Sequence, residues 1–226
     1  MSLSIRKLLP ETFRARHRST WASISLSVRV TYGKLKRRIF PVARPQVADG
    51  SVYLHLGSGA INHPSFINVD AVPAPHIHHL RQIDDLSLFG NNTADLIYAC
   101  HCLEHFSHSR IGAVLSEWHR VLKPGGVLRL SVPDFDLLLE IYRETGNDLN
   151  SILEVLMGKQ DYKYNFHMTA FTRQSLSDLL LKSDYTEVRE WHPGSSELTS
   201  LPDFSNYKLD VNGRKFPISL NLEAVK

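Results

Sequence analysis

The chain has 226 residues, 42% of them hydrophobic and 22% charged, which suits one folded domain with an appendage. No stretch approaches the roughly 18 uninterrupted apolar residues of a membrane-spanning helix, so the sequence excludes an integral membrane protein. The only two cysteines, Cys100 and Cys102, offer no disulfide framework, and we expect a reducing, cytoplasmic location.

Charge is distributed unevenly along the chain. Residues 1–50 hold 11 of the 26 Lys and Arg residues but only two of the 23 Asp and Glu residues, so they carry +9 while the remaining 176 residues carry −6. A basic arm of this kind favours contact with a polyanion, such as an anionic membrane, a phosphorylated substrate or nucleic acid. Two other interpretations stay open, a solvated leader and an Arg- and Ser-rich organelle transit peptide.

The arm is predicted over residues 1–50 and the main domain over residues 51–226, with a linker around Pro41, Pro45 and Gly50. Within the arm, residues 24–32 alternate as a strand would. A helical stripe fits the same segment through Trp21, Ile24, Val28 and Leu35, and we favour the helix.

From residue 51 onward, short apolar runs alternate with helical segments, the pattern of a parallel sheet with crossover connections. Strands are predicted at 52–56, 66–70, 94–100, 127–132, 188–191 and 218–224. Helices are predicted at 108–122, stopped by Pro124-Gly125-Gly126, then from Asp134 to Thr145, from Asp148 to Gly158, and at 176–181. The last two strands follow the final helix, which indicates an antiparallel hairpin at one sheet edge.

A glycine-bearing turn follows the first predicted strand. Gly57 and Gly59 permit a positive φ and a close backbone approach to a ligand, and Ser58 between them supplies a hydroxyl. The second strand ends at Asp70, whose carboxylate suits the vicinal hydroxyls of a ribose, although an acid after a strand also forms ordinary turns. We therefore expect a nucleotide-type site, and we expect a branched side chain at position 57 to block it without unfolding the domain.

Three ordered segments resemble the class I S-adenosylmethionine-dependent methyltransferases, and especially the predicted type 11-like members that accompany cell-surface glycan synthesis. They are Leu56-Gly57-Ser58-Gly59 with Val69-Asp70, the run from Ala94 to Phe106 that contains Leu103-Glu104-His105, and Arg120-Val121-Leu122-Lys123-Pro124-Gly125-Gly126. Asn165-Phe166-His167 and the closing run Ile218 to Leu222 also look like that group.

This resemblance implies an α/β, Rossmann-like doubly wound fold with a mostly parallel seven-stranded sheet, and S-adenosyl-L-methionine as cofactor. It places Gly57, Ser58 and Gly59 at the methionine and ribose part of the cofactor and Asp70 at the ribose hydroxyls. It also places Asp84, Asp85 and Leu86 at the adenine ring, and His101 beneath the sulfonium.

The connection from Gly57 to Asp70 departs from the usual family pattern. It is only thirteen residues long, Asn62, His63 and Pro64 break any helix within it, and Ala60 replaces a third glycine found in many members. We therefore expect the first helix to be truncated or missing.

Methyl transfer to an oxygen acceptor needs a group that takes up a proton. The candidates are His167, His105, Glu104 and Asp134, which are predicted at strand ends or in loops above the site. Simpler roles stay open, since Glu104 and Asp134 could cap helices and His105 could shape the cofactor pocket. We favour His167, which follows a Gly158 hinge candidate in a polar and aromatic loop suited to a lid.

The histidines at positions 76, 78 and 79 lack a carboxylate or cysteine partner at ligand spacing, so no metal site is expected.

By family analogy the acceptor is a sugar hydroxyl of a cell-surface glycan or its lipid-linked precursor. The alternatives are a methyltransferase acting on RNA or another small molecule, and a degenerate member that only binds. The sequence gives no oligomeric state.

Overall fold

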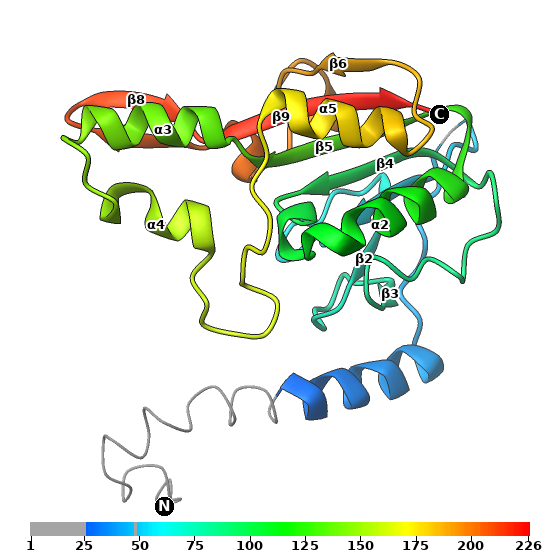
Figure 1. The fold of residues 1–226 in the computed structure, drawn as a ribbon. Helices are drawn as coiled ribbons and strands as arrows, with labels where there is room; N and C mark the ends of the chain where they lie inside the picture. The colour runs from blue at the N-terminus through cyan, green and yellow to red at the C-terminus, as the bar shows by residue number, and fades with distance from the viewer. Residues whose placement is uncertain (1–25, 48) are drawn as a thin grey trace, which may run out of the picture.

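The computed structural model describes residues 26–47 and 49–226. Seven strands form one sheet in the order β3-β2-β1-β4-β5-β9-β6 (Figure 1). Their bounds are β1 Tyr53–Leu56, β2 Phe66–Asp70, β3 His79–Leu80, β4 Ala94–Cys100, β5 Leu122–Pro133, β6 Val188–Glu190 and β9 Ser219–Val225.

Strands β3, β2, β1, β4 and β5 pair in parallel, whereas β9 runs antiparallel to both β5 and β6. This arrangement confirms the expected Rossmann-like, mostly parallel sheet of seven strands with an antiparallel edge. The edge is not a simple hairpin, because a separate two-stranded sheet of β7 (Lys208–Val211) and β8 (Arg214–Pro217) lies between β6 and β9 in the sequence.

The two faces of the sheet are covered differently. Helices α2 (His108–Val121) and α5 (Arg173–Lys182) cover one face (Figure 1) and contribute Trp118, Leu115 and Leu180 to the largest core cluster. On the other face, Phe66 and Tyr98 pack against Trp191 and Leu201. Residues 191–206, with the short 3-10 helices η3 (Glu197–Thr199) and η4 (Phe204–Asn206), supply that cover.

No helix lies between β1 and β2, as the short connection predicted. A tight turn replaces it, in which the Gly57 amide donates to the Val69 carbonyl and the Ile61 amide to the Ser58 carbonyl.

Two expectations about element bounds were wrong. Pro124-Gly125-Gly126 does not separate a helix from a strand, because β5 already begins at Leu122. The strand predicted at 188–191 ends at Glu190.

Helices α3 (Phe135–Glu144) and α4 (Asn150–Met157) follow β5 and lead into residues 158–172 (Figure 1). Asp134 caps α3 as predicted, and Gly158 ends α4 with a φ of 73°. In the arm, residues 26–39 are helical, whereas Trp21 and Ile24 lie outside the described residues. None of the described helices is long and apolar enough to span a membrane.

Candidate active site

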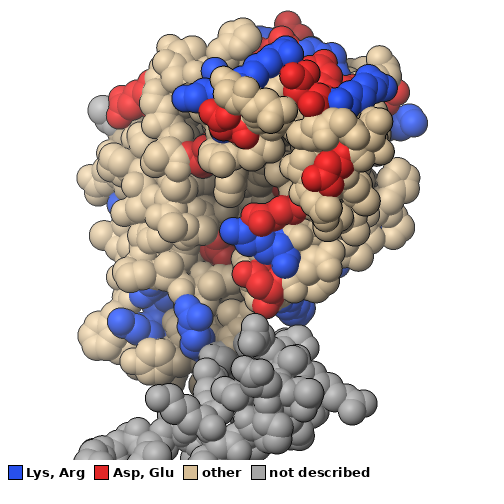
Figure 2. All heavy atoms as spheres, turned by 90° about the vertical axis from the view of Figure 1, so that its left-hand side faces the viewer, with Lys and Arg blue, Asp and Glu red and all other residues tan. Residues whose placement is uncertain are grey.

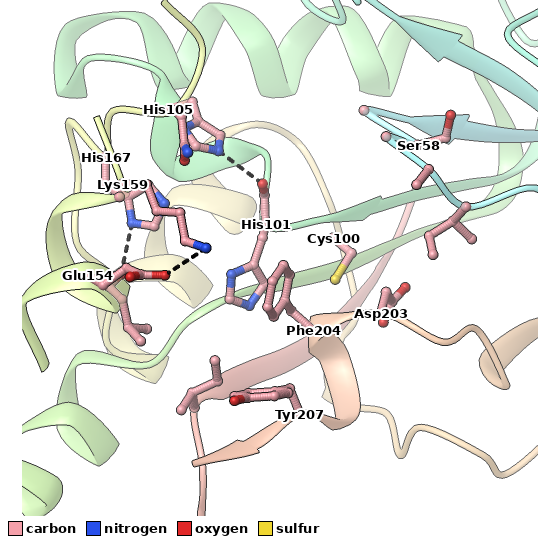
Figure 3. A pocket seen from close by; sticks show the side chains of 18 of the residues that line it. Ser58, Cys100, His101, His105, Glu154, Lys159, His167, Asp203, Phe204 and Tyr207 are labelled. Carbon is pink, nitrogen blue, oxygen red and sulfur yellow. Dashed lines mark hydrogen bonds and ion pairs between the residues drawn. The ribbon is translucent and has the colours of Figure 1, made fainter. Parts of the chain in front are cut away.

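A cavity of about 600 Å³ opens where β1 and β4 end (Figure 3). Its floor comes from Gly57, Ser58 and Gly59 after β1 and from Cys100 and His101 at the end of β4. Its walls come from segments far away in the sequence, namely residues 154–167 and residues 202–207. The carboxyl ends of parallel strands are where open α/β sheets bind their ligands.

The glycine turn is tied to the end of β2. The Asp70 carboxylate accepts hydrogen bonds from the Gly59 amide at 2.8 Å and from the Val72 amide at 2.7 Å. Burial raises the pKa of Asp70, while these two amides act in the opposite direction. Asp70 does not line the cavity itself, so in this structure it holds the turn in shape.

Glycine at position 57 has the positive φ that was expected, and close packing adds a second reason for it. Its φ is +64°, and a Cβ there would lie 2.3 Å from the Cys102 sulfur, which is buried in the core. A side chain at Gly57 would therefore disturb the packing between β1 and β4, in addition to the expected block of the cofactor, which stays a prediction. Gly59 has a φ of +54° and open space where its Cβ would be.

Glu104 is fully buried in η2 (Leu103–His105), and among residues 26–47 and 49–226 neither of its carboxylate oxygens has a hydrogen-bond partner. Two histidine rings, those of His101 and His167, lie beside Glu104, and the hydrogen bonds of each ring determine its tautomer. Ser219 Oγ donates to the Phe204 carbonyl and so accepts from Nε2 of His101, which leaves Nδ1 as a lone pair 3.5 Å from Glu104 Oε1. The Val155 carbonyl lies 2.9 Å from Nδ1 of His167, so Nε2 of that ring is the lone pair, 3.9 Å from the same oxygen.

Two imidazole lone pairs thus face one carboxylate oxygen, an arrangement that favours a proton on the carboxyl group. Burial raises the pKa of Glu104 to about 8. Burial also lowers the pKa of His101 to about 3 and that of His167 to about 4. Near neutral pH, these values correspond to a protonated Glu104 beside two neutral imidazoles.

His105 contacts carbonyl oxygens through both ring nitrogens. Nε2 lies 3.1 Å from the His101 carbonyl and Nδ1 lies 3.1 Å from the Phe166 carbonyl. The ring therefore joins the end of β4 to residues 158–167 and has no nitrogen left for a substrate. Burial lowers its pKa, which the two carbonyl contacts oppose.

Ligand atoms of Glu104, His105 and His167 lie within 4.8 Å of one another, a grouping that the spacing of these residues in the sequence did not suggest. The nitrogens of His105 are directed at carbonyl oxygens, however, so this cluster has two free donor groups at most.

Several predicted site residues lie outside the cavity. Asp134 caps α3 by accepting from the Asp136 amide. Asp84 pairs with Arg110, and Asp85 pairs with Arg81. Leu86 is buried in the main core. The structure brings together the other predicted residues, Gly57, Ser58, Gly59, His101, His105 and His167, with Glu104 directly beneath them.

Sequence reasoning missed the wall formed by residues 202–207. Tyr98 donates from its hydroxyl to the Asp203 carboxylate at 2.6 Å, and Phe204 stacks near His101 with ring centroids 5.2 Å apart (Figure 3). Phe204 and Tyr207 line the cavity from this segment. No motif marks the segment, because what places it is its contact with β4 and β9.

The cavity fits a nucleoside cofactor in three respects. Its volume lies within the range of about 300–1,000 Å³ typical of small-molecule sites. The Ser58 hydroxyl lines it, is buried and has no hydrogen-bond partner within the described part of the chain. The backbone at Gly59 is open to close approach.

Comparisons with known proteins bear on the domain type and the fold. Residues 67–130 match a family described as methyltransferase domain, and no curated protein sequence matches the chain. A 1,6-didemethyltoxoflavin-N1-methyltransferase from Burkholderia thailandensis, solved with bound 1,6-didemethyltoxoflavin and S-adenosylhomocysteine, is 16% identical. That alignment covers 100% of this chain and 92% of the other, with a TM-score of 0.51, and it shows the shared fold.

Two further solved structures are similar. The S-adenosylmethionine-dependent methyltransferase of Archaeoglobus fulgidus is 16% identical, with 88% of this chain and 94% of that chain covered and a TM-score of 0.48. An S-adenosylmethionine-dependent methyltransferase from Thermotoga maritima is 15% identical. That alignment covers 94% of this chain and 96% of the other, with a TM-score of 0.49. The methyltransferase domain matched at residues 67–130, together with the sheet order, indicates an S-adenosylmethionine-dependent methyltransferase, with S-adenosyl-L-methionine as its cofactor.

Proposed function

We propose that this methyltransferase O-methylates a sugar hydroxyl of a cell-surface glycan or of its lipid-linked precursor, with His167 as the residue that takes up the proton. One observation carries the assignment of the base. His167 lines the cavity, and its Nε2 is a lone pair with no hydrogen bond to any residue that the structure describes, whereas both nitrogens of His105 contact carbonyl oxygens.

S-adenosylmethionine supplies a methyl group on a sulfonium, so the protein mainly has to align the acceptor and accept its proton. The Val155 carbonyl holds the His167 ring through Nδ1, which keeps Nε2 free to accept. Glu104 Oε1 lies 3.9 Å from Nε2, too far for a hydrogen bond, and only its ionised form, above about pH 8, stabilises a cationic ring through charge. The two groups titrate as a coupled pair.

The glycine turn holds the cofactor in this proposal. Gly57, Ser58 and Gly59 contribute backbone and the unpaired Ser58 hydroxyl, while Asp70 fixes the turn through the Gly59 amide. His101 forms part of the floor between this turn and His167. The roles of Asp84, Asp85 and Leu86 at the adenine ring stay predictions.

The composition of the wall supports a sugar as the acceptor. Tyr162, Phe204 and Tyr207 provide aromatic faces, and Asn165 and Asp203 provide hydrogen-bonding groups beside them. A sugar ring has apolar faces and hydroxyl edges, so it matches a cavity that mixes the two.

RNA is the second candidate acceptor, and the cavity favours it less. Among the residues that line it, Lys159 is the single Lys or Arg, and it pairs with Glu154 at 3.2 Å. Phosphate recognition depends on several cationic side chains. We also propose a cytoplasmic location, which the free thiols of Cys100 and Cys102 support.

The test is transfer of a radiolabelled methyl group from S-adenosylmethionine to three kinds of acceptor: free sugars, lipid-linked glycans and RNA. Label on a sugar hydroxyl that depends on His167 supports the proposal, whereas label on RNA alone would replace it. Isothermal titration with the cofactor identifies the remaining alternative, a member that binds without turnover. In that case affinity is micromolar, roughly −8 kcal/mol, and no acceptor is labelled.

A further inference from the structure

The helical residues 26–39 lie against the body of the protein at a defined orientation. Arg37 donates to the carbonyls of Ala74, Pro75 and Ile77 at 2.7–2.8 Å. Gly33 packs so closely that a Cβ would lie 2.8 Å from the Leu80 side chain. These contacts fix which face of the helix points inward and which points outward.

The outward face is apolar. At about 100° per residue, Val28, Leu35, Ile39 and Tyr32 fall on one stripe about opposite the half-buried Gly33 and Arg37. Their exposed fractions are 64%, 58%, 61% and 67%, so four large apolar side chains stand in solvent on adjacent turns. Single exposed apolar residues are ordinary, but a contiguous stripe marks an interaction surface.

Basic side chains flank this stripe on both sides. Arg29 and Lys36 lie along one border and Lys34 and Arg38 along the other, all four of them exposed, and residues 26–47 contain no Asp or Glu. Figure 2 shows Lys and Arg gathered at the lower left of the molecule, at the height of this helix in Figure 1, without acidic side chains beside them.

We infer that residues 26–39 dock on an anionic membrane surface, with the stripe of Val28, Tyr32, Leu35 and Ile39 in the headgroup region and the basic side chains at lipid phosphates. An apolar ridge between two basic borders is the pattern of an interfacial helix. Nucleic acid would use the charges but would leave the stripe exposed. A symmetric pair of these helices would set the basic borders of two copies against each other.

The helix packs beside β3 at the edge of the sheet, against residues 73–80. Residues 71–77, which receive Arg37, follow the end of β2, and within them His76 Nε2 contacts the Gly59 carbonyl at 3.1 Å. A membrane-docked helix therefore places the glycine turn near the surface where a lipid-linked acceptor resides. The docking itself uses residues outside the cavity and does not depend on the acceptor proposed above.

The test uses the full chain and vesicles of phosphatidylglycerol and phosphatidylcholine in equal parts, with pure phosphatidylcholine vesicles as reference. The double variant Leu35→Ser/Lys36→Gln removes one apolar and one basic group from the proposed surface. Leu181→Ser/Lys182→Gln on α5 is its matched control, since both residues there are also exposed.

We expect the wild type and the α5 control to sediment with the anionic vesicles and to be released by high salt, because the contact rests partly on screened charge. The 35/36 variant should bind at least about tenfold more weakly, with unchanged cofactor affinity by titration. Equal binding of all three proteins, or no binding to anionic vesicles, overturns the inference. A change in sedimentation of the free 35/36 variant would instead identify the stripe as an interface between two copies.

Discussion

Nε2 of His167 lies 3.9 Å from Oε1 of Glu104, and Nδ1 of His101 lies 3.5 Å from the same oxygen. Three groups that all offer lone pairs thus meet beneath the cavity. This arrangement favours a proton on Glu104, and that protonation state is open to direct tests.

His167→Ala is expected to keep cofactor affinity and to lower turnover by about 10²–10⁴-fold, the usual loss for a general base. His105→Ala should instead weaken cofactor binding, because it cuts the link from the His101 carbonyl to the Phe166 carbonyl. Titration and methyl-transfer rates of both variants make the comparison. A His167→Ala rate near that of the wild type at saturating acceptor would mean that the ring only binds the sugar.

Glu104→Gln should change how stability depends on pH. The pKa of Glu104 is raised from 4.5 to about 8 in the folded state, so its contribution to stability is complete below pH 4.5 and is lost as the pH rises through about 8. His101 and His167 have lowered pKa values, about 3 and about 4, so their contributions are complete above pH 6.5 and are lost as the pH falls toward those values.

Between pH 6.5 and 8, Glu104 is therefore the group in this cluster whose charge changes on folding. The free energy of unfolding of the wild type should fall across this window, by up to about 1.4 kcal/mol per pH unit. In Glu104→Gln the decline should be absent. Urea unfolding at several pH values measures it, and a parallel decline in both proteins would contradict the protonated Glu104.

The two glycines of the turn should respond differently to substitution. Gly57→Ala forces a Cβ onto the Cys102 sulfur at a positive φ, and we expect it to lower the melting temperature strongly. In Gly59→Ala the new Cβ meets open space, and the only destabilisation comes from an alanine at a positive φ. The domain should therefore stay folded while cofactor affinity falls. Thermal melting and titration of both variants check this order, and the reverse order would refute the packing argument.

Asp70→Ala leaves the amides of Gly59 and Val72 without their acceptor. Loss of such buried partners costs about 1–3 kcal/mol, so we expect a lower melting temperature together with weaker cofactor binding. Asp70→Asn is the matched variant, because its amide oxygen still accepts one of these hydrogen bonds. If both variants bind the cofactor as the wild type does, the turn does not need this support.

Strands whose apolar runs are buried on both sides were predictable residue by residue, as β2 and β4 show. The strands β3, β7 and β8 were not predictable. With two residues, β3 is too short to show an alternating pattern of apolar and polar residues, and the hairpin of β7 and β8 carries the exposed residues Lys208, Arg214 and Lys215.

In the site, the glycine turn and His167 were predictable from local sequence patterns. The free nitrogen of His167 was not predictable, because it depends on a contact of the ring with the Val155 carbonyl, twelve residues away in α4. Asp84 and Asp85, which were expected at the adenine ring, instead pair with Arg110 and Arg81 outside the cavity.

Residues 203–207 combine two kinds of side chain in one short segment. Asp203 holds the segment to Tyr98, and the carbonyls of Phe204 and Ser205 hold it to Ser219 and Asn221 on β9. The side chains of Phe204 and Tyr207 face the cavity and take no part in these anchoring hydrogen bonds. Substitution at these two positions could therefore exchange one acceptor for another over evolutionary time while the sheet beneath them keeps its stability.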